Sequence, residues 1–250
     1  MCTVLIRVRP GTACGVLIAA VRDEFADRGW AGPAQHWLPA SPAIGGIDSR
    51  TRGTWLAVWP GPARAAVVVN GAEADGARPD PARSRGALPL AALGGRDLLT
   101  VDPEPFAGFH LLLADGTGAQ VLSWDGRSRA SWRLAAGDHT LSFYGVDDPA
   151  HPRIRRMRAA LGALPDPGLA AGTETGRAWG AWTGLLADRG RHGAEPDALL
   201  VDRLVDGRRY RSSSAALVAL PGPAGRYDFT ADPRSVGSWQ RADKGMTTWN

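Results

Sequence analysis

The sequence predicts an α+β fold in which antiparallel sheets are layered with a few inserted helices. Short apolar segments recur in pairs, and each pair is joined by a turn rather than by a helix. A parallel sheet would need a long crossover, usually a helix, between successive strands. Helical patterns are confined to three segments, which are residues 87–100, 152–163 and 176–189.

The first strand pair begins directly after the second residue. Residues 3–8 (TVLIRV) and 15–21 (GVLIAAV) are apolar, and the segment PGTACG between them is typical of a turn. Two further hairpins follow the same pattern around Pro60-Gly61 and Asp115-Gly116. Their strands are expected at 53–59 and 64–70, and at 108–114 and 119–124.

The remaining segments complete the layered arrangement. Residues 74–86 are polar and rich in Pro and Arg, which predicts a loop. Shorter strands are expected at 131–134 and 139–144, and a last strand pair at 211–220 and 225–230. No linker divides the chain, so we expect a single domain over residues 1–250.

Composition excludes several classes of function. The net charge of +4 comes almost entirely from arginine, and the arginines form no run beyond Arg153, Arg155, Arg156 and Arg158, which we assign to one polar helix face. A nucleic-acid surface needs a clustered basic stripe, so no nucleic-acid partner is expected. No signal peptide, membrane span or zinc spacing is present, which favours a soluble, cytoplasmic protein without a metal.

Cys2 is the strongest candidate for chemistry. Removal of Met1 would place a thiol and a free α-amine on one residue. An α-amine titrates at about 7.7–8.0 and can accept the thiol proton near neutral pH. A nucleophile with its own amine as base is an established route to covalent catalysis. The alternative is a small residue at a frayed terminus.

Arg22 and Asp23 are expected beside Cys2. If strands 3–8 and 15–21 pair antiparallel, the start of one meets the end of the other. The thiol, guanidinium and carboxylate would then share one edge of the sheet, at an exposed strand end, where Arg22 would favour the thiolate. A structural salt bridge between Arg22 and Asp23 remains the alternative.

The chain resembles the NRDE family, also called the transport and Golgi organisation protein 2 family. The resemblance rests on the Met-Cys start, on the run 20–25 (AVRDEF) and on the run 52–57 (RGTWLA). Weaker correspondences are Arg85-Gly86 before a helix, the segment 109–112 (FHLL) and the segment 211–214 (RSSS). The sequence departs from the family pattern at Val21, Arg52, His110 and Asp147-Asp148, where the family has Asn, Gly, Asn and a Ser-Asn element.

That family is in turn similar to the N-terminal-nucleophile hydrolases, above all the cysteine type that acts on bile-salt and penicillin-like amides. The resemblance implies a four-layer αββα sandwich and a set of catalytic roles. Cys2 would be the nucleophile and Asp23 would hold its amine. The other implied site residues are Arg22, Asn70 as an oxyanion donor, Arg211 at the far side, and Asp147 or Asp148 in place of a second amide.

Two functions follow from this pattern. The first is hydrolysis of a non-peptide amide through an acyl-thioester, which requires no cofactor and takes a small-molecule amide. A carboxylate at Asp148 opposes an oxyanion and so counts against it. The second is a non-catalytic carrier of haem or another hydrophobic ligand in intracellular haem trafficking, with Cys2 as a thiolate ligand of the iron.

Overall fold

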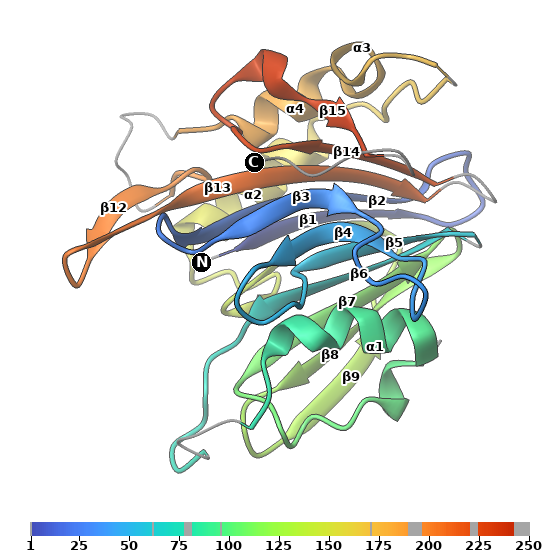
Figure 1. Cartoon of the computed structure of the whole chain (residues 1–250). Helices are drawn as coiled ribbons and strands as arrows, with labels where there is room; N and C mark the ends of the chain where they lie inside the picture. Colours follow the sequence, from blue (N-terminus) through green and yellow to red (C-terminus); the bar gives the residue numbers. More distant parts are fainter. Residues whose placement is uncertain are drawn as a thin grey trace.

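The computed structural model describes residues 2–61, 63–77, 82–95, 97–170, 172–189, 197–220 and 225–242. Within these ranges the strands form two antiparallel sheets, one of eight strands and one of seven (Figure 1). The predicted α+β class is confirmed, because short helices flank these sheets instead of alternating with parallel strands.

The first sheet carries the start of the chain. Its strand order is β11–β10–β1–β2–β13–β14–β15, and β12 pairs with β13 beside this path. The strands are β1 (Thr3–Arg9), β2 (Gly15–Phe25), β10 (Gly137–Ser142), β11 (Gly145–Val146), β12 (Asp202–Val205), β13 (Arg208–Leu220), β14 (Arg226–Thr230) and β15 (Gln240–Arg241).

The second sheet is a meander in which each strand pairs with the next along the chain. Its strands are β3 (Trp30–Ala34), β4 (Ile44–Asp48), β5 (Leu56–Pro60), β6 (Ala63–Asn70), β7 (Phe109–Asp115), β8 (Gly118–Trp124) and β9 (Arg129–Arg133).

The helices are short. They are α1 (Leu88–Gly95), α2 (Pro152–Gly162), α3 (Thr175–Trp179) and α4 (Ala181–Leu186), with 3-10 turns η1 (Arg85–Ala87), η2 (Leu98–Thr100) and η3 (Val236–Ser238). None of the described helices has the length and apolar character that a membrane span requires.

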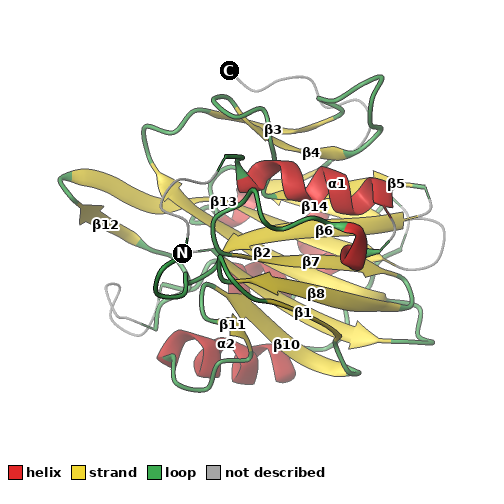
Figure 2. Ribbon diagram, turned by 90° about the horizontal axis from the view of Figure 1, so that it is seen from below, coloured by secondary structure: helices red, strands yellow, loops and turns green. Residues whose placement is uncertain are grey.

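Three apolar cores separate four layers. The central core joins the facing sides of the two sheets, for example Ile6 and Val218 with Val67 and Leu112. A second core seals the first sheet against α2, α3 and α4, and a third seals the second sheet against α1. Figures 1 and 2 show this order of helices, sheet, sheet and helix, which confirms the expected αββα sandwich.

Most predicted strands are confirmed, and the differences have local causes. The expected helix at 176–189 is two helices, because Gly180 between α3 and α4 has φ 52° and ψ −123°. Residues 53–55 precede β5 instead of extending it. The sequence did not indicate β3, β4, β12 or the two-residue strands. The prediction of one domain over residues 1–250 includes ranges outside the described residues and stays a prediction.

Candidate functional site

The hairpin of β1 and β2 brings Cys2 to the end of β2. Thr3 lies opposite Val21 in the antiparallel register, so the residue before Thr3 meets the residues after Val21. The half-buried Cys2 points its Sγ toward the carbonyl oxygen of Asp23 at 3.8 Å. The predicted proximity of Cys2 to the Arg22-Asp23 segment is confirmed.

Arg22 and Asp23 point to opposite faces of the first sheet, because successive side chains on a strand alternate. Arg22 reaches toward the second sheet, where its guanidinium lies over the Trp55 ring at 4.4 Å. Asp23 reaches toward the helical layer and the Arg153 guanidinium on α2 at 3.8 Å. The alternative of a salt bridge between Arg22 and Asp23 is therefore wrong, and the two charges do not share one face.

Asp23 is buried rather than exposed, with 0% of its side chain accessible. Its Oδ1 accepts a hydrogen bond from Ser212 Oγ at 2.6 Å, and its carbonyl oxygen accepts one from the Tyr210 hydroxyl at 3.1 Å. Arg153, which the sequence placed on a polar helix face, is buried as the ion-pair partner of Asp23. The carboxylate thus joins β2 to β13 and to α2.

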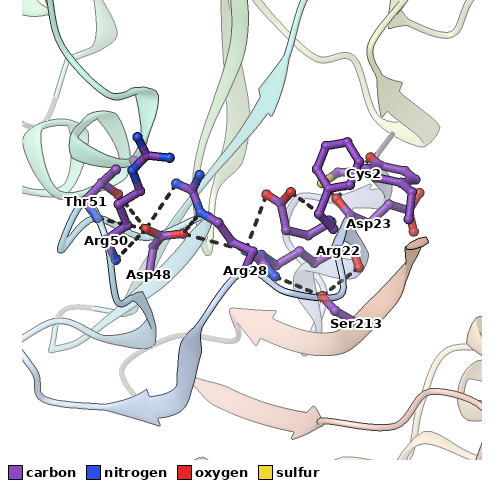
Figure 3. A network of polar contacts seen from close by, with 12 residues as sticks. Cys2, Arg22, Asp23, Arg28, Asp48, Arg50, Thr51 and Ser213 are labelled. Carbon is purple, nitrogen blue, oxygen red and sulfur yellow. Dashed lines mark hydrogen bonds and ion pairs between the residues drawn. The ribbon is translucent and has the colours of Figure 1, made fainter. Parts of the chain in front are cut away.

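The Arg22 guanidinium is held by a serine hydroxyl and by two nearby carboxylates. Its Nη1 donates to Ser213 Oγ at 3.0 Å, and that hydroxyl donates to the Arg22 carbonyl oxygen at 3.2 Å. Its Nη2 lies 3.6 Å from Glu24 and 3.9 Å from Asp48. Figure 3 shows Arg22 between the Ser213 contact and the acidic side chains, next to Cys2.

Asp48 is a central residue that the sequence analysis missed. At the end of β4 it accepts from Arg28 Nε at 2.7 Å, from the Thr51 backbone N–H at 2.8 Å and from the Thr51 hydroxyl at 3.0 Å (Figure 3). The only local signal was an Asp followed by Ser-Arg-Thr, a common turn pattern. Its proximity to Arg22 comes from stacking of the two sheets, which the spacing of residues does not reveal.

An open cleft of about 880 Å³ lies at this end of the sandwich. Four of the six candidate catalytic residues line it: Cys2, Arg22, Asp23 and Asn70. The volume is within the range of about 300–1,000 Å³ that is typical of small-molecule sites.

Asn70 ends β6 and is exposed to the cleft. Among the described residues its side chain has no hydrogen-bond partner, so the amide N–H groups are available to a ligand. Asp148 accepts from the Ala150 N–H at 2.8 Å, and Arg211 lies on β13 opposite Glu24 and Asp202. Neither Asp148 nor Arg211 is among the residues that line the cleft.

Asp147 supports a turn of the first sheet. It has φ 54°, and its Oδ1 accepts from the Thr140 N–H at 2.7 Å. Its Oδ2 lies 2.7 Å from Nδ1 of His139. Asp147 is likewise absent from the cleft lining.

Two of the family-like motifs pack directly on each other at the cleft. A Cβ on Gly53 would lie 2.5 Å from the backbone carbon of Gly86, and Thr54 N–H donates to the Gly86 carbonyl oxygen at 2.8 Å. Only glycine permits so close an approach of two backbones. The contact fixes Arg85, the residue before Gly86, over the cleft. Arg52, where the family has Gly, has φ 59°.

Burial raises the pKa of the Cys2 thiol above its ordinary value, and the nearby negative charge of Asp23 acts in the same direction. Arg22 lowers this pKa, but its effect is smaller than that of burial. Arg22 thus acts on the thiol in the predicted direction, but burial outweighs it and the pKa of Cys2 stays raised. A neutral thiol needs a base to become a nucleophile.

The fold and this cleft define a four-layer αββα protein with a cysteine at the cleft wall. The sequence profile of the family described as Transport and Golgi organisation 2 matches residues 1–193, and the chain belongs to that family. The resemblance read from the sequence is confirmed. No curated protein matches the sequence.

Solved structures provide a further comparison, with 41 matching chains. One is the C2A mutant of conjugated bile acid hydrolase from Clostridium perfringens, with a TM-score of 0.49 and 10% sequence identity. The match covers 100% of this chain and 97% of that chain.

Proposed function

We propose that this protein is a cysteine hydrolase of the N-terminal-nucleophile type that cleaves a non-peptide amide through an acyl-thioester. One observation carries the proposal: Cys2 lines a cleft of small-molecule size together with an unengaged amide, Asn70. The proposal requires removal of Met1, which lies outside the described residues.

The first half-reaction forms the thioester. The α-amine of Cys2 takes the thiol proton, and the sulfur attacks the carbonyl carbon of the amide. The carbonyl electron pair moves to oxygen, and Asn70 Nδ2–H donates to this oxyanion, a contact of a kind worth about 2.7–4 kcal/mol. The carbonyl then re-forms, the C–N bond breaks, and the ammonium gives its proton to the departing nitrogen.

The second half-reaction releases the acid. Water attacks the thioester carbonyl while the amine accepts its proton. The C–S bond breaks, and the sulfur leaves as a thiolate that regains the proton from the ammonium. Because burial disfavours the thiolate, this proton return is favourable.

The surrounding charges position the reacting groups in this proposal. Arg22, held by Ser213 and Glu24, supplies positive charge to the cleft near the sulfur. Asp23 holds β2 against β13 and α2, and so fixes the carbonyl group that faces the thiol. The resemblance gave Asp23 the amine as partner, and that role remains a proposal. Asp148 and Arg211 take no step.

Trapping of the acyl-enzyme tests the proposal. The protein is incubated with a panel of acyl amides, quenched in acid and weighed intact, with Cys2→Ala as the control. We expect a mass lower by one methionine before reaction and an acyl adduct on Cys2 afterwards. A homogeneous product that retains Met1 would rule out the self-activated nucleophile.

A ligand carrier is the second candidate, and the size of the same cleft favours it. For haem the fit is incomplete. Cys2 offers one soft donor, but the apolar side chains of the lining are few, namely Phe25, Trp55, Val68 and Ala107. A porphyrin needs apolar walls on both faces. Saturable binding of one haem, with a spectrum shifted by Cys2→Ala, would nevertheless support the carrier.

A further inference from the structure

Three arginines that line the cleft, called the wall below, form no ion pair with the residues that the structure describes. Within the described ranges, no carboxylate lies within 4.0 Å of the guanidinium groups of Arg50, Arg83 or Arg85. The other arginines of the lining each have a carboxylate partner: Arg22 with Glu24, Arg28 with Asp48, and Arg208 with Asp27.

Arg85 is the best placed of the three unpaired arginines. It is half-buried, and its Nη1 donates to the Gly108 carbonyl oxygen at 2.9 Å. The nearby acid Glu73 is instead turned to the Gly108 N–H, at 3.3 Å. Burial lowers the pKa of the Arg85 guanidinium, while the charges of Glu73, Cys2 and Glu24 act in the opposite direction, so Arg85 lies within electrostatic range of the Cys2 sulfur.

The backbone beneath Arg85 is fixed. Gly86 packs against Gly53, and the Thr54 N–H donates to its carbonyl oxygen at 2.8 Å. A preorganised guanidinium loses little conformational freedom when it binds an oxyanion. Arg50 and Arg83 are exposed and line the same cleft, so they add positive charge to it.

We propose that Arg85, supported by Arg50 and Arg83, binds an anionic group of the ligand, so that the substrate is an amide that also carries a carboxylate or a phosphate. That the ligand is an amide substrate rests on the proposed function, whereas binding of an anion at this site does not depend on catalysis. Guanidinium groups bind both anions through paired, charge-assisted hydrogen bonds, which makes arginine suited to this task.

Binding to the Cys2→Ala protein tests the anion site without turnover. Two matched pairs are titrated by calorimetry at low salt: succinamate against succinamide, and N-acetylethanolamine phosphate against N-acetylethanolamine. We expect the anionic member of at least one pair to bind roughly 10-fold tighter or more, as for a charge-assisted hydrogen bond. The pair with the larger ratio identifies the anion as carboxylate or phosphate.

Arginine substitutions test whether the wall causes the preference for the anionic ligand. Arg85→Gln in the Cys2→Ala background should reduce the ratio to near one, whereas Arg85→Lys should keep part of it. The matched control is Arg52→Gln, an exposed arginine near the cleft but outside its lining, which should leave the ratio unchanged. Unchanged thermal unfolding excludes misfolding as the cause.

The outcomes separate the two proposals. Equal binding of anionic and neutral members, or a preference that survives Arg85→Gln, would overturn the anion site even if wild type forms an acyl-enzyme. An anion preference without any acyl-enzyme in wild type would leave the site intact and remove the hydrolase.

Discussion

Asp23 and Arg22 are neighbours in sequence but serve opposite faces of the first sheet. Both residues line the cleft, but the Asp23 carboxylate is buried in the junction of β2, β13 and α2, where Ser212 and Arg153 contact it. The period of two along a strand would have predicted this separation. Replacement of Asp23 should therefore lower the stability of the fold in addition to any effect on catalysis.

Asp23→Asn should destabilise the fold by about 1–3 kcal/mol, because it removes a charge from a buried hydrogen-bonded ion pair. Arg153 and Ser212 would lose their anionic partner. The midpoint of urea unfolding measures the effect. Glu24→Gln, one residue further on and only half-buried, is the control and should shift the midpoint much less. Equal shifts for the two variants would show that the Asp23 contacts contribute little.

The reactivity of Cys2 should depend on its processing. With Met1 retained, the raised pKa of the thiol predicts slow alkylation by iodoacetamide at neutral pH and a rate that climbs as pH rises. With Met1 removed, the adjacent amine should speed the labelling of Cys2 and place it ahead of Cys14, whose pKa burial also raises. Peptide mapping after limited labelling measures the alkylation rates of Cys2 and Cys14. Labelling of Cys14 first in the processed chain would contradict the assigned site.

One glycine, Gly180, ends α3 and separates it from α4. Gly180 has φ 52° and ψ −123°, and no atom lies within 4 Å of where a Cβ would sit. The cost of any side chain there is therefore conformational rather than steric. The break orients Trp179 and Trp182 so that both are buried against the first sheet.

Gly180→Ala should destabilise the protein by about 1–3 kcal/mol, the usual cost of a strained backbone position. Gly184→Ala is the matched control, since Gly184 is exposed inside α4 and also has open space around it. That change should stabilise by about 0.5–1 kcal/mol. Chemical denaturation compares them, and effects of the same sign would refute the role given to Gly180.

His139 on β10 and Asp147, which follows β11, form a charged pair whose two pKa values shift in opposite directions. The hydrogen bond that His139 donates to the Asp147 carboxylate raises the pKa of His139 above 6.5, although burial and, to a smaller extent, Arg158 oppose the shift. Burial would raise the pKa of Asp147, but the hydrogen bonds from His139 and Thr140 outweigh it and lower this pKa. Since the folded pKa of His139 is raised, its contribution to stability is present below about 6.5 and is lost as pH rises through the folded value.

His139→Gln should therefore destabilise the protein by about 1–2 kcal/mol at mildly acidic pH. The difference from wild type should shrink as pH rises, because neutral histidine loses its charge-assisted bond. It should also shrink in strong acid, where Asp147 becomes protonated. Urea midpoints of both proteins over a pH series give the difference, and a gap that stays constant with pH would refute the charged pair.

The fold as a whole was predictable where contacts are local. The hairpins β1–β2, β5–β6 and β7–β8 follow from apolar runs and turn residues close in sequence. The strands β3 (WAGPA) and β4 (IGGID) were missed because Gly and Pro hide the strand pattern. Those glycines serve packing: a Cβ on Gly46 would lie 2.3 Å from the Trp55 ring.

The site was predictable only in part for the same reason. Cys2 and Arg22 meet through one hairpin, so the sequence could place them together. Asp48, Asn70 and Arg85 reach the cleft through stacking of the two sheets and packing of distant loops. No spacing along the chain encodes those contacts, and the positive charge of the wall depends on ion pairs between residues that are distant in the sequence, such as Arg28 with Asp48 and Arg208 with Asp27.

Intact-mass measurement of acyl-enzyme formation tests most directly whether Cys2 is the nucleophile of this cleft. Wild type and Cys2→Ala are compared on one panel of amides, including the anionic and neutral pairs, after unfolding curves show that both are folded. We predict that wild type lacks Met1 and gains an acyl group on Cys2, while Cys2→Ala gains none. Equal inertness of the two proteins toward the whole panel, or an adduct that persists in Cys2→Ala, would contradict the hydrolase and leave only the fold and the ligand site.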